Sequence, residues 1–153
     1  LSATYNLWPV SRAKWVLRRF DHSAIYVLIA ATYTPFIMAL KESYLAIALL
    51  IGVWCAAIGG VVLKLALPGR YDRLAVGLYL ALGWSGVMLY DAVVKAVPPL
   101  SLWLVVAGGV LYSLGVIFHA WQRLRFQNAI WHGFVLLGAA CHYTAILDLI
   151  ILT

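Results

Sequence analysis

Long apolar runs separated by short polar connectors dominate the chain. Five runs are long enough to cross a bilayer as helices, because about 20 apolar residues at ~1.5 Å per residue span its hydrocarbon core. They lie near residues 22–40, 44–67, 74–94, 100–120 and 129–152, and residues 1–8 have the character of the tail of a preceding helix. The pattern predicts an all-α polytopic transmembrane helical bundle, with residues 1–153 forming a single transmembrane domain.

Proline and small residues interrupt or shape these runs. Pro35 should kink or weaken the first full span, and Pro68 and Gly69 should end the second. Gly52, Ala56 and Gly60 recur at every fourth residue of the second span. We therefore expect a smooth face there, on which another helix of the monomer or of a partner packs closely.

Composition excludes a soluble domain. The chain is 65% hydrophobic and only 10% charged, with a mean hydropathy of +0.97, whereas soluble domains are nearer 45–50% apolar. Its net charge of +6 sits in short connectors between spans, which argues against nucleic-acid binding. Cys55 and Cys141 fall within apolar runs, where buried and inert thiols are expected. Because the chain starts at Leu1 without a charged segment, we expect no signal peptide and interpret it as part of a longer protein.

The basic residues predict an orientation. Of the eleven Lys and Arg residues, only Lys41 and Lys95 fall in connectors on one side, each near an acidic residue. The connectors on the other side hold the remainder: Arg12, Lys14, Arg18, Arg19, Lys64, Arg70, Arg73, Arg123 and Arg125. By the positive-inside rule these three connectors face the cytoplasm and the C-terminus lies outside.

Several polar side chains share one depth under this topology. Asn128 and His132 are four residues apart and so lie on one helix face. Asp21 begins its span at the same side, and the set of candidates for one polar cluster is Ser2, Asn6, Asp21, Asn128 and His132. An intramembrane histidine is a functional candidate. The alternative is that these are ordinary polar helix ends, with Asp21 favoured by the helix dipole and the histidines bonded to neighbouring helices.

Three segments carry a family resemblance. RRFDHSAIYVLIAATYTPF (18–36), GVLYSLGVIFHAWQRL (109–124) and AIWHGFVLLGAACHY (129–143) resemble the hemolysin III family, the bacterial branch of the adiponectin and progestin receptor superfamily. The resemblance implies a seven-helix, receptor-like fold in the bacterial cytoplasmic (inner) membrane, with the N-terminus inside and the C-terminus external. It also implies that helix one and most of helix two are absent from this chain.

The resemblance further implies a zinc site, from which this chain departs. Ser2, Asp21 and His132 match the family pattern, but Asn6 and Asn128 stand where the family has the other two zinc-binding histidines. A catalytic zinc needs about three imidazole, thiolate or carboxylate donors plus a water, and amide oxygens suit harder cations. His22 points about 100° away from Asp21 and His142 lies too deep to replace them. We therefore expect a degenerate, largely empty site with His132 as its remaining metal ligand, and no cofactor.

Two functions stay open at this stage. In the favoured one, the chain is a membrane protein without metal-dependent catalysis that binds lipids or belongs to a larger membrane protein complex. In the alternative, implied by the superfamily, it is a zinc-dependent hydrolase of lipid amides or esters, with Asp21 orienting the catalytic water. A pore, suggested by the family name alone, lacks a charged ring or polar stripe along the spans.

Overall fold

The computed structural model describes residue 4 and residues 7–40, 44–66, 72–121 and 123–152. In order, its elements are α2 (Arg12–Ala39), α3 (Tyr44–Ala66), α4 (Asp72–Trp84), the 3₁₀ helix η1 (Ser85–Leu89), α5 (Tyr90–Ala96), α6 (Pro99–Ala120) and α7 (Gln127–Leu152). Five stretches are long and apolar enough to span a membrane, with α4, η1 and α5 together providing one of them. The predicted all-α polytopic bundle is thus confirmed.

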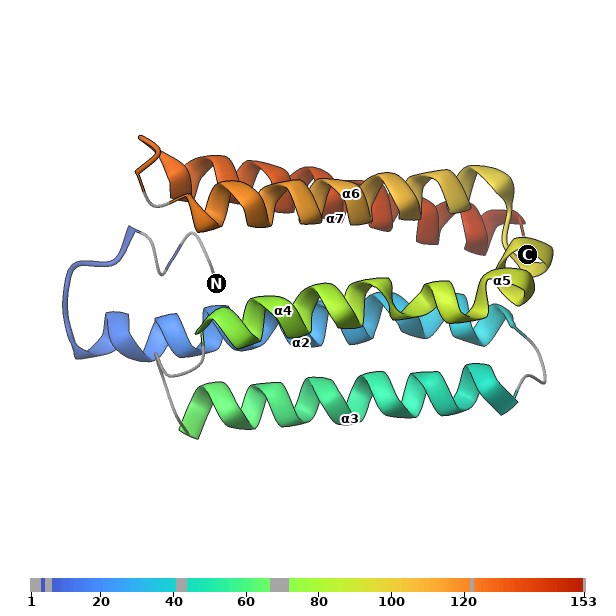
Figure 1. The fold of residues 1–153 in the computed structure, drawn as a ribbon, viewed down its shortest axis with the longest axis horizontal. Helices are drawn as coiled ribbons and strands as arrows, with labels where there is room; N and C mark the ends of the chain where they lie inside the picture. Colours follow the sequence, from blue (N-terminus) through green and yellow to red (C-terminus); the bar gives the residue numbers. More distant parts are fainter. Residues whose placement is uncertain (1–3, 5–6, 41–43, 67–71, 122, 153) are drawn as a thin grey trace.

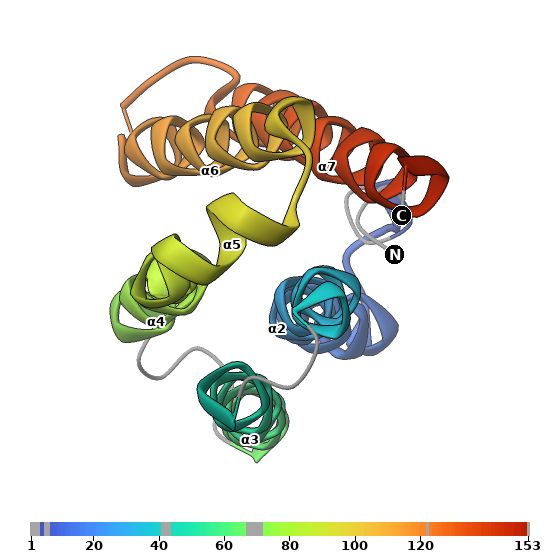
Figure 2. The ribbon, with the colours of Figure 1, turned by 90° about the vertical axis from the view of Figure 1, so that its right-hand side faces the viewer.

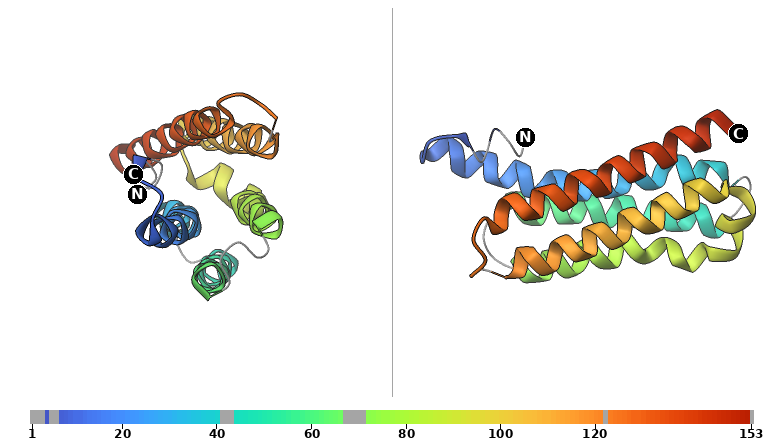
Figure 3. Two further views of the ribbon diagram at one scale, coloured as in Figure 1. Left: turned by 90° about the vertical axis from the view of Figure 1, so that its left-hand side faces the viewer. Right: turned by 90° about the horizontal axis from the view of Figure 1, so that it is seen from above.

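The helices form an antiparallel bundle in which α2 contacts α3, α4 and α7 (Figure 1). Viewed along the helices, α6 and α7 form one layer, while α2, α3 and α4 group beside it (Figures 2 and 3). We call the end where α2, α4 and α7 begin and α3 and α6 end the basic end, because the predicted basic connectors flank it. Helix α7 ends at the opposite end of the bundle.

Helix α2 starts earlier than the hydropathy pattern predicts. It begins at Arg12, where the Ser11 hydroxyl caps it by accepting a hydrogen bond from the Lys14 backbone N–H (3.3 Å). Asp21 consequently lies in the helix interior, and the interpretation of Asp21 as a first-turn residue held by the helix dipole is wrong. At its other end α2 continues through Pro35 as far as Ala39.

The third predicted span is not one continuous helix. Its α-helix gives way to a 3₁₀ helix at Ser85, which frees backbone groups that hydrocarbon cannot solvate. The Tyr33 hydroxyl, on α2, accepts from the Gly86 N–H (2.7 Å), and its single hydrogen is shared between the carbonyl oxygens of Leu82 and Gly83, each 2.9 Å away. One phenol therefore satisfies the break and ties the third span to α2.

Helices α6 and α7 pack almost backbone to backbone. The buried residues of α6 are Ser101, Gly108 and Gly115, spaced seven apart, so they form one seam facing α7. A Cβ placed on Gly108 would lie 2.5 Å from Nε2 of His142, and one on Gly115 would lie 2.9 Å from Cβ of Phe134. Small residues are thus required for this close approach.

Helices α2 and α3 make the second close pair. The Tyr26 ring is fully buried and lies on Gly60, where a Cβ would approach three ring carbons to 2.5–2.6 Å. Gly52 has nothing within 4 Å of an added Cβ, and Ala56 is exposed, so the predicted smooth face contacts another described helix only at Gly60. The reason is the helical period, since a four-residue step advances about 40° round the helix. Cys55 lies on the exposed side, and its expected burial is wrong.

Candidate functional site

The predicted polar cluster draws on α2 and α7, which contact each other in the bundle. Asp21 on α2 and His132 on α7 are both half-buried, and Asn128 is exposed in the first turn of α7. Ser2 and Asn6 lie outside the described residues. The two central members are therefore on neighbouring helices toward the basic end, and the convergence of all five stays a prediction.

The donor set at this place does not fit zinc. Within the part of the chain that the structure describes, no three His, Cys, Asp or Glu side chains gather in a way that could hold a metal ion. The described members offer one imidazole, one carboxylate and one amide, from His132, Asp21 and Asn128. A zinc centre with an open position for water takes three stronger donors. The described donors are thus fewer than a zinc centre takes, and the polar cluster stays a prediction.

His142 serves the contact between α6 and α7. Its Nε2 lies 3.1 Å from the Val105 carbonyl oxygen, and its ring centroid lies 5.4 Å from that of Tyr112. These partners are both on α6. A hydrogen-bonded histidine in a helix seam adds packing specificity.

Side chains at the start of α7, close to His132 in the sequence, contact the last turn of α6. The Gln127 side-chain amide donates to the His119 carbonyl oxygen, and the ring centroids of His119 and Trp131 are 5.1 Å apart. Both contacts link the first turns of α7, which carry His132, to the last turn of α6.

A second polar pair, at the end opposite the basic end, was missed by sequence reasoning. The Ser101 hydroxyl donates to Oδ2 of Asp148 (2.6 Å) and lies 3.0 Å from the Ala145 carbonyl oxygen. Ser101 is fully buried. The sequence feature that could have revealed this pair is Asp148 in the apolar run LDLIIL, since a carboxylate in a span normally has a protein partner.

A third polar group lies between α2 and α3 at the basic end and was also missed. Ser23 and Lys64 are 5% and 3% exposed, and Arg19 donates from Nη1 to the Leu65 carbonyl oxygen (3.1 Å). Ser23 Oγ and Arg19 Nε are buried, and no described residue offers either atom a hydrogen-bond partner. The signal in the sequence was a four-residue spacing that places Arg19 and Ser23 on one face of a helix.

Comparison with known proteins gives a consistent result. Residues 1–143 match the family model described as "Haemolysin-III related". The chain is 40% identical to the hemolysin-3 homolog of Bacillus subtilis over 136 residues, covering 89% of this chain and 64% of that protein. It is 39% identical to hemolysin-3 of Bacillus cereus, covering 83% of this chain and 58% of that one.

A more distant relative is the human monocyte to macrophage differentiation factor, 31% identical over 91% of this chain and 59% of that protein. The chain thus spans about three fifths of the length of these curated relatives. No solved structure matches it significantly.

Proposed function

The chain belongs to the haemolysin-III related family of integral membrane proteins, and from that premise we propose that it acts by binding lipid or a partner membrane protein, without metal-dependent catalysis. The observation that carries this proposal is the donor set: Asn128 stands where the family resemblance places a histidine, and His132 is the one imidazole beside it. An amide oxygen is a weak, hard donor, so zinc affinity at this place should be low.

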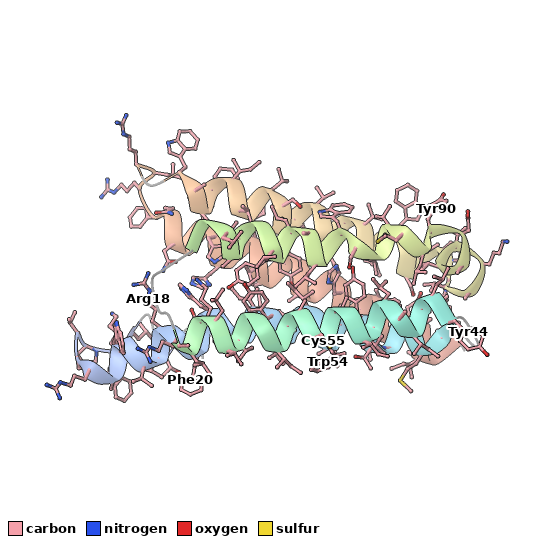
Figure 4. The ribbon with its side chains drawn as sticks, turned by 60° about the horizontal axis from the view of Figure 1, so that its bottom comes forward. Arg18, Phe20, Tyr44, Trp54, Cys55 and Tyr90 are labelled. Carbon is pink, nitrogen blue, oxygen red and sulfur yellow. The ribbon has the colours of Figure 1, made fainter. Side chains whose placement is uncertain are left out.

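The outer surface of the bundle supports a role within the membrane. Large apolar side chains are exposed along the spans, among them Ile58 and Val62 of α3 and Leu136 of α7. Tyr44 and Tyr90 are exposed together at the end opposite the basic end (Figure 4). Tyrosine favours the membrane–water boundary, so the exposed tyrosines support a position of that end at an interface. Lipids are therefore the proposed first partners, and a larger membrane complex is the second.

We place the basic end in the cytoplasm and the C-terminus outside the cytoplasmic (inner) membrane. Arg18, Arg19, Arg123 and Arg125 all flank that end, and positively charged connectors remain in the cytoplasm. The measurement is labelling of an Arg70→Cys variant in intact cells, with Cys55 and Cys141 replaced by alanine. Strong labelling from outside would reverse the orientation.

Metal analysis tests the catalytic part of the proposal. After dialysis against trace zinc, the purified chain should hold far less than one equivalent. The double substitution Asn6→His and Asn128→His should restore binding if the backbone keeps the family geometry, because three imidazoles then become available. One equivalent of zinc in the unsubstituted chain, together with chelator-sensitive hydrolysis of a lipid amide or ester, would establish the hydrolase instead.

A further inference from the structure

Arg19 holds its guanidinium in a fixed position at the junction of α2 and α3. Its Cζ lies 3.5 Å from the centroid of the Trp15 ring, and its Nη1 donates to the Leu65 carbonyl oxygen, in the last turn of α3. Stacking on one face and a hydrogen bond at one edge leave little freedom to the group. The Nε edge is buried and lacks a partner among the described residues.

Ser23 brings a second unsatisfied group to the same face of α2. A serine hydroxyl in a helix commonly bonds to the carbonyl four residues earlier, but Ser23 Oγ has no partner among the described residues although the side chain is 5% exposed. It lies one turn after Arg19. Leaving such a group unpaired costs roughly 1–3 kcal/mol, so two neighbouring ones on one face suggest a ligand that bonds to both.

Lys64 adds a second cation opposite Ser23. In the antiparallel pair, Tyr26 of α2 lies on Gly60 of α3, so the residue one turn later on α3 lies level with the residue one turn earlier on α2. Lys64 is 3% exposed and belongs to the same buried face of α3 as Gly60.

The one acidic residue of α2 lies on another face of that helix than Arg19 and Ser23. Asp21 is the only acidic residue in the two helices, and it is two positions from both Arg19 and Ser23, about 200° round the helix. The junction thus brings together two cationic side chains, Arg19 and Lys64, and two buried atoms, Arg19 Nε and Ser23 Oγ, that have no hydrogen-bond partner among the described residues. Cationic groups and hydrogen-bond donors together are the chemistry that recognises a phosphate group.

We propose that Arg19, Ser23 and Lys64 form a binding site for the phosphate group of an anionic membrane lipid. Lipid is favoured over free phosphate because the junction lies at the basic end of the bundle, beside Trp15 and Phe20, which are both about half exposed. Aromatic side chains of this kind settle at headgroup depth. Figure 4 shows Arg18 and Phe20 at this end of α2. The inference rests on the proposed lipid-binding function and names the chemistry of its ligand.

The test is a titration of the purified, delipidated chain in a zwitterionic detergent containing a chelator. Phosphatidylglycerol, phosphatidylcholine and inorganic phosphate are added separately, and binding is read by native mass spectrometry and by thermal unfolding. We expect one saturable phosphatidylglycerol per chain. Arg19→Gln should weaken it about tenfold, because charge-assisted hydrogen bonds to phosphate are strong.

Arg18→Gln is the matched control, since it removes the same charge from the exposed neighbouring residue and should change affinity less than about twofold, as expected for a screened surface charge. Ser23→Ala should weaken binding while leaving the Arg19 bond to Leu65 intact, so it keeps the test open if Arg19→Gln does not fold. Lys64→Met should also weaken phosphatidylglycerol binding.

Three results would overturn the site. Equal weakening of binding by Arg18→Gln and Arg19→Gln would indicate a diffuse basic surface. Unchanged binding in Arg19→Gln and Ser23→Ala would mean that Arg19 only caps the end of α3 and does not bind lipid. Saturable binding of inorganic phosphate without phosphatidylglycerol would make free phosphate the ligand and refute the lipid. The titration contains a chelator, so its failure would refute the phosphate site and leave the proposal of a metal-free protein unaffected. Zinc uptake in the metal analysis would refute the metal-free proposal and leave the phosphate site unaffected.

Discussion

The two closely packed helix pairs, α6–α7 and α2–α3, differ in whether their buried polar groups have hydrogen-bond partners. Between α6 and α7, Ser101 bonds to Asp148 and His142 to the Val105 carbonyl. Between α2 and α3, the buried Ser23 Oγ and Arg19 Nε have no partner among the described residues. In hydrocarbon a satisfied polar group fixes one packing arrangement, whereas an unsatisfied one favours a ligand. We therefore expect α6 and α7 to form the more rigid pair, and the proposed lipid site assigns binding to α2 and α3.

The pairs also differ in how far the backbones approach. The seam of α6 uses a small residue at each of three positions seven apart. The α2–α3 pair depends on one glycine beneath the ring of Tyr26, with Ala57 and Val53 filling the rest of that core. A close seam repeated over several turns tolerates added volume less well than one contact.

The largest expected effect is at Gly108. Gly108→Ala should lower the free energy of unfolding by about 3 kcal/mol, because the new Cβ collides with the His142 ring and lies 3.1 Å from the Gly138 carbonyl oxygen. Denaturation in detergent micelles, followed by helix content, measures it. Gly133→Ala in α7, where an added Cβ meets nothing within 4 Å, is the control and should be neutral or slightly stabilising.

A smaller effect is expected at Gly60. Gly60→Ala should cost about 2 kcal/mol, since the buried Tyr26 ring must move to accommodate the methyl group. Gly59→Ala, one residue away in open space, is the matched control in the same assay. A larger loss at Gly60 than at Gly108 would reverse the assignment of the rigid pair.

The smallest effect compares two serines. Ser101→Ala should cost about 1–2 kcal/mol, because Asp148 then loses its hydrogen-bond donor. Ser23→Ala should instead stabilise delipidated protein, by up to roughly 1–3 kcal/mol, because it removes a buried hydroxyl that has no partner among the described residues. Thermal unfolding of both variants side by side is sufficient. Similar losses at the two positions would remove the contrast between the pairs.

The sequence predicted the spans well but their ends and continuity less well. Hydropathy located all five spans, because an apolar run must be long enough to cross the bilayer whatever it packs against. It did not reveal that α2 starts at Arg12, since polar residues at a membrane boundary are compatible with both helix and loop. The break at Ser85 was also missed, because its stability comes from Tyr33 on another helix.

For the candidate site, too, one part could be predicted from the sequence and another part could not. The donor types at Asp21, Asn128 and His132 are properties of the sequence, and the proposal of weak zinc binding rests on them. Which buried polar groups find partners is a property of the packed helices: Ser101 and Ser23 look alike as serines in apolar spans, yet one faces Asp148 and the other faces none. The sequence by itself determined a membrane bundle and the donor types at the predicted site, because hydrophobicity and ligand chemistry are local. Only the tertiary structure decided where hydrogen-bonding capacity is left over, because that depends on the register between helices distant in the chain.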